Sequence, residues 1–379
     1  MRAVALIDGE HAPDVVRQAL GELPYEWVGA ILVGGTEKLR EGEGYGVPLL
    51  DGFGGAEVVV DLSDAPVLGP AERFGWASRA LAAGLPYLGA GFRFDPPLYE
   101  ELGVPSIAVI GTGKRVGKTA VSAHLARLLA RDRDVVVVTM GRGGPAEPEV
   151  LESPPGIEAL LALSREGRHA ASDHFEIAVV SGVPTIGCRR AGGGLAGQPF
   201  LSNVGEGARI AAERRPDLVI FDGSGSAIPP VAADRRILVT GPGHHLGEHF
   251  DAYRELVSDL VLAVGYEADG AISATLRLRP LAPLEGRVAV FTAGPADLTH
   301  LDADLVYVSR SLGDRDALRR ELLDLDADTY LTEIKGAAID LVAEHGLERG
   351  RRVVLAGNEV VAPGLDQALL ALAPDAVSA

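Results

Sequence analysis

The sequence predicts an α/β fold with a mostly parallel sheet in its larger part and a smaller α/β domain in front of it. Short β-branched runs alternate with helix-length amphipathic stretches, a pattern typical of parallel sheets that helices cover on both faces. One of these runs leads through a glycine-rich loop at 111–119 straight into an amphipathic helix. Prolines cluster just before that run and indicate a break between two domains.

The expected strands follow one another along the whole chain. They are 3–7, 29–33, 57–61, 107–110, 135–139, 177–180, 218–221, 237–240, 260–264, 288–291, 305–308 and 353–356. Asp-Pro-Pro and Val-Pro steps between 94 and 105 place the boundary, so we expect domains at 1–103 and 104–379. Whether the chain from about 280 forms a further part is left open by the pattern.

Composition limits the classes of partner. The chain has 379 residues and a formal net charge of −18, so we expect neither nucleic acid nor an anionic membrane to be bound. Cys188 is the single cysteine, which excludes an intrachain disulfide and a thiolate zinc cluster. No apolar run approaches the roughly 20 residues that span a bilayer, and the N-terminus has a strand pattern, so a cytoplasmic location is expected.

The loop at 111–119, Gly-Thr-Gly-Lys-Arg-Val-Gly-Lys-Thr, is the strongest functional signal. A strand, a glycine-rich loop and a helix are the context of a P-loop, in which backbone N–H groups surround phosphate oxygens. Lys118 is expected to reach the β- and γ-phosphates of ATP and Thr119 to bind Mg²⁺. Lys114 adds a cation that could neutralise transition-state charge or be solvated. The expected ATP-binding residues are Gly111, Thr112, Gly113, Arg115, Val116, Gly117, Lys118 and Thr119.

Two further segments lie at predicted strand ends. Asp222 ends a buried strand and begins the turn Asp-Gly-Ser-Gly-Ser-Ala, where a carboxylate can hold Mg²⁺ or cap a helix. The loop after 135–139 carries Arg142, which suits a phosphate, and Glu149, which suits Mg²⁺. Ligands of α/β sheets gather at the carboxyl ends of strands. We therefore expect Asp222, Arg142 and Glu149 to lie near the phosphate loop at 111–119.

A third segment, Gly-Cys-Arg-Arg-Ala-Gly-Gly-Gly-Leu-Ala-Gly at 187–197, reads as a loop that binds an anion. Arg189 and Arg190 offer planar guanidinium groups, and Gly193 and Gly194 let the backbone approach a phosphate. His174 either contacts the substrate or belongs to a helix cap. Cys188 has no neighbouring base and is expected to be a buried structural residue.

These motifs together resemble the cyclic 2,3-diphosphoglycerate synthetase family, and the loop alone resembles the related dethiobiotin synthetase group. The resemblance implies that ATP and 2,3-diphosphoglycerate give the cyclic phosphoanhydride, ADP and phosphate. It implies catalytic roles for Lys114, Lys118 and Arg142, and substrate contacts from Arg115, Arg142, Arg189 and Arg190. From related P-loop enzymes, Asn358 is expected to contact the adenine. The resemblance is also compatible with a homodimer.

Two alternatives remain at this stage. One is another ATP-dependent ligase or kinase of the dethiobiotin synthetase type. The other is a P-loop nucleotide switch, whose loop usually carries a lysine five positions before the P-loop lysine. Position 113 is glycine here, and Lys114 lies four positions before Lys118, which counts against a switch.

Overall fold

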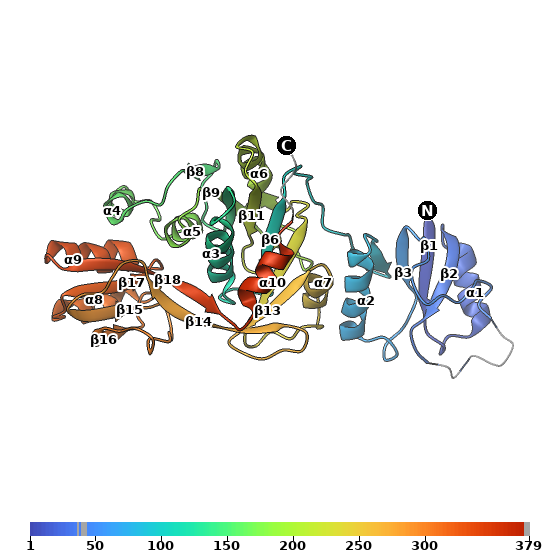
Figure 1. Ribbon diagram of the computed structural model, residues 1–379. Helices are drawn as coiled ribbons and strands as arrows, with labels where there is room; N and C mark the ends of the chain where they lie inside the picture. The colour runs from blue at the N-terminus through green and yellow to red at the C-terminus, as the bar shows by residue number, and fades with distance from the viewer. Residues whose placement is uncertain (36–37, 39–43, 375–379) are drawn as a thin grey trace. The chain divides into compact units, whose positions relative to one another are not determined.

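The computed structural model describes residues 1–35, 38 and 44–374, which form two compact units (Figure 1). The first unit comprises Met1–Leu98 together with His245–Val257, and the second comprises Tyr99–His244 and the chain from Ser258 onward. The first unit thus ends near the break expected at 103, but nothing in the sequence pattern indicated that 245–257 returns to it. Aromatic packing joins this segment to the unit, since the Phe250 ring lies 5.2 Å from that of Phe74 and 5.1 Å from that of Phe94.

The first unit is built on a five-stranded sheet of order β2-β1-β3-β4-β5, parallel except for the last pair. Both longer helices begin with a proline, whose fixed φ suits the first helical position. The elements are β1 Arg2–Ile7, α1 Pro13–Glu22, β2 Glu26–Leu32, β3 Val58–Asp61, α2 Pro70–Ala82, β4 Tyr87–Gly89, β5 Phe92–Phe94 and, from the returning segment, α7 Asp251–Leu256.

The second unit contains a thirteen-stranded sheet of order β10-β9-β7-β11-β6-β12-β13-β14-β18-β17-β15-β16, with β8 paired to β9. Its strands are β6 Ser106–Gly111, β7 Val135–Gly141, β8 Glu149–Leu151, β9 Thr185–Ala191, β10 Leu201–Ser202, β11 Leu218–Asp222, β12 Arg235–Thr240, β13 Leu260–Val264, β14 Ile272–Pro280, β15 Arg287–Phe291, β16 Asp304–Ser309, β17 Thr329–Glu333 and β18 Arg352–Val361. Its helices are α3 Lys118–Leu129, α4 Ile157–Arg165, α5 Asp173–Ser181, α6 Val204–Glu213, α8 Arg315–Leu323, the π-helix η1 Ala338–Ala343, α9 Glu344–Glu348 and α10 Leu365–Leu372.

Helices cover both faces of the central strands. One face of β6, β7 and β11 packs with α3, α5 and α10 in a single core that includes Val109, Val121, Ile177 and Leu369. On the other face α6 packs closely on β9 and β7, because Gly207 leaves room for the thiol of Cys188. The mixed α/β fold with a mostly parallel sheet is therefore confirmed.

The part beyond 280 continues the same sheet. β14 and β18 pair antiparallel and connect the strands around α3 with β15–β17, as Figure 1 shows. A separate core of Phe291, Leu312, Tyr330 and Val342 lies under α8 and η1. The chain beyond 280 therefore shares the sheet of the second unit but has a hydrophobic core of its own.

Several local expectations were wrong. The apolar run 177–180 belongs to helix α5, which ends at Gly182 with φ of +80°, because a run of four apolar residues does not distinguish a strand from a buried helix. The segment with Arg189 and Arg190 is the end of strand β9 and not a loop. The strand prediction missed β9, β14 and β17, together with the short strands β4, β5, β8 and β10.

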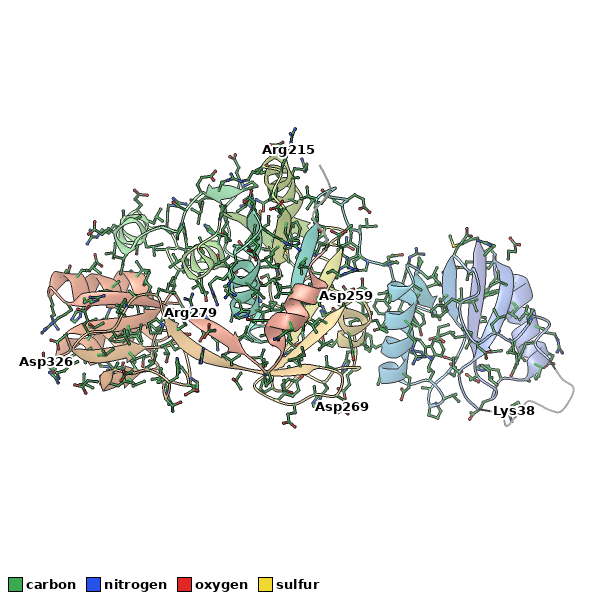
Figure 2. All side chains as sticks on the ribbon, viewed as in Figure 1. Lys38, Arg215, Asp259, Asp269, Arg279 and Asp326 are labelled. Carbon is green, nitrogen blue, oxygen red and sulfur yellow. The ribbon has the colours of Figure 1, made fainter. Side chains whose placement is uncertain are left out.

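The surface agrees with the acidic composition. Asp259, Asp269 and Asp326 are exposed, and Asp269 and Asp326 lie at the edge of the molecule in Figure 2. In the part of the chain described here, no helix is both long and apolar enough to cross a membrane.

Candidate active site

The loop between β6 and α3 has the backbone shape of a phosphate loop. Arg115 and Gly117 have positive φ, +60° and +100°, so the chain folds tightly before α3 begins at Lys118. The ammonium of Lys118 donates to the carbonyl of Gly113 at 2.6 Å, and the side chain is buried. A Cβ at position 111 would lie 2.8 Å from Cδ of Lys118. A side chain at position 111 would therefore displace the Lys118 stem from its present place.

Asp222 stands at the end of β11, beside the loop. Its register partners are Val109 of β6 and Thr139 of β7, so three strand ends meet here. The buried carboxylate accepts a hydrogen bond from Ser122 Oγ at 2.7 Å. Burial, helped by the charge of Asp173, raises the pKa of Asp222 to about 7, although the Ser122 hydrogen bond opposes this. A cation placed beside this carboxylate would be bound favourably.

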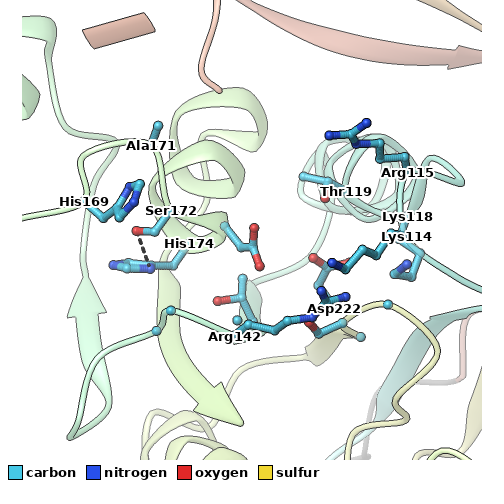
Figure 3. Close-up of a pocket in the computed structure, with 18 residues that line it drawn as sticks. Lys114, Arg115, Lys118, Thr119, Arg142, His169, Ala171, Ser172, His174 and Asp222 are labelled. Carbon is cyan, nitrogen blue, oxygen red and sulfur yellow. Dashed lines mark hydrogen bonds between the residues drawn. The ribbon is translucent and has the colours of Figure 1, made fainter. Parts of the chain in front are cut away.

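A cavity of about 390 Å³ opens over the loop at these strand ends. Figure 3 shows Lys114, Lys118 and Asp222 on one side of it and His174 on the other, with Arg142 extending toward Asp222. Its lining comes from four segments: Lys114, Arg115, Lys118 and Thr119; Thr139, Gly141, Arg142, Gly143 and Gly144; His169, Ala171, Ser172, Asp173 and His174; and Asp222, Gly223, Ser224 and Gly225. Four cationic side chains (Lys114, Arg115, Lys118 and Arg142) and two carboxyl groups (Asp173 and Asp222) thus line one cavity.

Two guanidinium groups approach the backbone at Gly225. A Cβ there would lie 2.6 Å from Nη2 of Arg142 and 3.3 Å from Nη2 of Arg190. Arg190 donates to the carbonyls of Gly192 and Ser224, at 2.6 and 2.7 Å, and does not line the cavity itself. Burial and the charge of Arg142 lower the pKa of Arg190. Two like charges held this close favour an anion between or beside them.

His174 closes the far wall of the cavity. Its ring covers Gly187, where a Cβ would lie 2.6 Å away, and its Nε2 lies 3.2 Å from Oε2 of Glu149. Burial lowers the pKa of His174, although the Glu149 carboxylate opposes this, so the ring is neutral near neutral pH. The one N–H of the neutral ring faces the Glu149 carboxylate, and Nδ1 lies 3.3 Å from Ser172 Oγ, so these two contacts fix the orientation of the ring at the cavity.

Glu149 is not brought to the cavity. Its carboxylate oxygens accept from Arg168 at 2.6 and 2.8 Å and face His174, so they are engaged away from Thr119. Among the residues that the structure describes, no group of three or more His, Cys, Asp or Glu side chains could hold a metal ion. Of the residues expected at Mg²⁺, only Thr119 and Asp222 line the cavity.

Other expected residues lie elsewhere. Arg189 and Arg190 are neighbours in a strand, so their side chains point to opposite faces, and Arg189 is exposed. Gly193 and Gly194 are exposed and lie outside the cavity lining. Asn358 was expected at a strand end, but β18 continues to Val361.

The remaining loop residues Thr112, Gly113, Val116 and Gly117 shape the backbone that leads to Lys118. Thr112 donates to the hydroxyl of Thr240 at 3.2 Å, and Val116 is buried against Gly241. These contacts tie the loop to the end of β12.

Asp173 is a cavity residue that the site prediction left out. It is the first residue of α5, and its carboxylate lies near Gly141. The available signal was the pair Asp-His after Ser172, but the strand expected at 177–180 hid the helix that presents them.

A strand that leads through this loop into a helix, with a buried lysine and an aspartate on the adjacent strand end, defines a P-loop nucleotide-binding protein. Family models divide the chain among three domains. Residues 106–275 match the P-loop domain of cyclic 2,3-diphosphoglycerate synthetase, 292–359 match its C-terminal domain, and 2–53 and 53–95 match its N-terminal domain. The chain belongs to the cyclic 2,3-diphosphoglycerate synthetase family, as the sequence motifs predicted.

Named relatives agree along nearly the whole length. Cyclic 2,3-diphosphoglycerate synthetase of Rubrobacter xylanophilus is 47% identical, with 98% of this chain and 97% of the relative aligned. The enzyme of the same name from Pyrococcus furiosus is 38% identical, with 94% of each chain aligned. Among solved structures, LpxK from Aquifex aeolicus in complex with ATP has a TM-score of 0.45 at 14% identity, over 73% of this chain and 91% of its own. That likeness is too low to relate its residues to those described above.

Proposed function

We propose that this chain is an ATP-dependent synthetase that converts 2,3-diphosphoglycerate into cyclic 2,3-diphosphoglycerate, ADP and phosphate. The observation that carries the proposal is its full-length membership of the family together with the cationic cavity over the phosphate loop. The bound nucleotide would be ATP, held by the loop backbone and Lys118.

The proposed reaction has two displacement steps. A substrate phosphate oxygen attacks the γ-phosphorus of ATP, and the bond to the β-phosphate oxygen breaks to release ADP. An oxygen of the other substrate phosphate then attacks the phosphorus of the phosphate that was extended. This closes the ring through a P–O–P bond and expels the former γ-phosphoryl group as inorganic phosphate.

Charge neutralisation is the main task of the side chains. Lys118, Lys114 and Arg142 line the cavity and would offset the negative charge of two phosphorylated reactants. Phosphate oxygens are already ionised near neutral pH, so neither attack requires a general base. Burial raises the pKa of the Cys188 thiol to about 12, so this residue is not the nucleophile.

We expect a magnesium ion to be bound beside Asp222. Asp222 is a buried carboxylate whose pKa is raised by burial and by neighbouring acids, and Thr119 lies in the same lining. These two residues would hold Mg²⁺, which would supply charge stabilisation to the β- and γ-phosphates. Asp173, on the opposite helix, would face the same charged ligands.

The fate of the γ-phosphorus tests the proposal. With ATP labelled by ³²P at the γ position and unlabelled 2,3-diphosphoglycerate, we expect all label in inorganic phosphate and none in the cyclic product. A kinase or ligase that transfers the group permanently would leave label in the organic product. ATP hydrolysis that does not depend on 2,3-diphosphoglycerate would also contradict the proposal.

A matched pair of lysine variants separates loop chemistry from a general loss of charge. Lys118→Met should abolish label release, whereas Lys38→Met, at an exposed position of the first unit, should leave it unchanged.

A further inference from the structure

Helix α5 connects the cavity with the part of the second unit beyond 280. Asp173 and His174, at its start, line the cavity. Phe175 packs in a cluster with Leu160 and Ile339 of η1, and Ile177 lies in the main core. The first turn of α5 therefore packs against several other elements, and its orientation determines the positions of Asp173 and His174 in the cavity.

Glu176 is a buried carboxyl group in this turn, three residues after Asp173. The ammonium of Lys335 lies 3.5 Å from its Oε1. Asp173, Glu333 and Asp222 are further carboxyl groups that interact electrostatically with Glu176. Lys335 is thus the cation that offsets a carboxylate buried among other carboxylates.

Lys335 is itself set on a fixed segment. It follows β17, whose last residue, Glu333, accepts from the backbone N–H of Ala293 and from Nδ2 of Asn358, both at 2.6 Å. The amide of Lys335 donates to the carbonyl of Glu333 at 3.0 Å. Asn358, expected at adenine, therefore contributes here to anchoring the lysine segment.

We infer that Lys335 is a positioning residue: its ion pair with Glu176 fixes the first turn of α5 and so holds Asp173 and His174 in place for the acid substrate. The inference rests on the proposed function, because the substrate whose binding should change is 2,3-diphosphoglycerate. The cavity lining itself lies within 114–225, so Lys335 acts through α5 and does not touch the ligands.

The test compares four variants by steady-state kinetics of phosphate release, with both substrates varied. Lys335→Met leaves the Glu176 carboxylate buried without its cation, and we expect the KM for 2,3-diphosphoglycerate to rise about tenfold while the KM for ATP changes less than about twofold. Lys335→Arg retains the charge and should stay within about twofold of wild type. Lys38→Met is the matched surface control and should behave as wild type.

The double variant Glu176→Gln with Lys335→Met provides the rescue. It buries no unpaired charge, so its KM for 2,3-diphosphoglycerate should rise only about threefold, less than that of Lys335→Met alone. This variant also carries the test if Lys335→Met does not fold. A role in stability alone would lower the melting temperature without separating the two KM values.

Three results would overturn the inference while leaving the proposed function intact. They are an unchanged KM for 2,3-diphosphoglycerate in Lys335→Met, an equal rise in both KM values, and a double variant no better than the single one. If wild type and Lys38→Met fail to turn over 2,3-diphosphoglycerate, the proposed function falls, and the inference falls with it.

Discussion

Replacing Gly225 by alanine should damage the site through Arg142. The residue has φ of +62°, where a side chain costs about 1–2 kcal/mol of folding free energy. The new Cβ would lie 2.6 Å from Nη2 of Arg142, roughly 1 Å inside van der Waals contact, so the guanidinium must move. A hydrogen bond to a charged group contributes about 1.5–3 kcal/mol. If the Arg142 guanidinium binds a substrate phosphate, the loss of that bond should lower kcat/KM roughly 10- to 150-fold.

Gly350→Ala separates strain from displacement. Gly350 has nearly the same φ, +65°, but a Cβ there would meet nothing within 4 Å. Urea denaturation should therefore give both variants a similar loss of unfolding free energy, while phosphate release should fall only in Gly225→Ala. The reasoning is refuted if Gly225→Ala keeps kcat/KM within about twofold of Gly350→Ala at saturating ATP.

Three further predictions concern single residues. Lys118→Met should lower kcat at least about 100-fold with little loss of stability, as measured by phosphate release and thermal denaturation, because the lysine neutralises phosphate charge; near-normal turnover would contradict its role. Asn358→Ala should leave the KM for ATP unchanged but destabilise the fold by about 1–3 kcal/mol in urea, because it removes a hydrogen bond to the buried Glu333; a selective rise in that KM would restore the adenine assignment. The pKa of Asp222 is raised from 3.8 to about 7, so the unliganded folded state binds the extra proton. Its unfolding free energy should then fall as pH rises from about 4 to about 7, by up to about 1.4 kcal/mol per pH unit, and Asp222→Asn should flatten this slope in denaturation at fixed ionic strength; an identical slope in the variant would argue against it.

The sequence reached most of the central sheet because its strands are continuous apolar runs. Buried parallel strands such as 107–110, 135–139 and 218–221 need no partner information to be recognised. The strand prediction failed at 177–180, because a short apolar run fits a buried helix as well as a strand and here belongs to α5. It also failed at β9, because charged residues such as Arg189 interrupt the apolar pattern of that strand.

The residues of the site divide in the same way. Lys118, Thr119, Arg142 and Asp222, which line the cavity, were expected from the sequence because phosphate loops and strand-end acids have local signatures. Asp173 was not included, since its place in the cavity depends on how α5 packs.

By itself the sequence determined that the loop at 111–119 is a phosphate loop and that the family is that of cyclic 2,3-diphosphoglycerate synthetase. Both follow from short runs of residues whose spacing is fixed by local backbone geometry. Only the tertiary structure decided which arginines line the cavity, where Asn358 donates, and that Lys335 meets Glu176. Those contacts join residues far apart in the chain, and no local pattern encodes which strand faces or helix turns will meet.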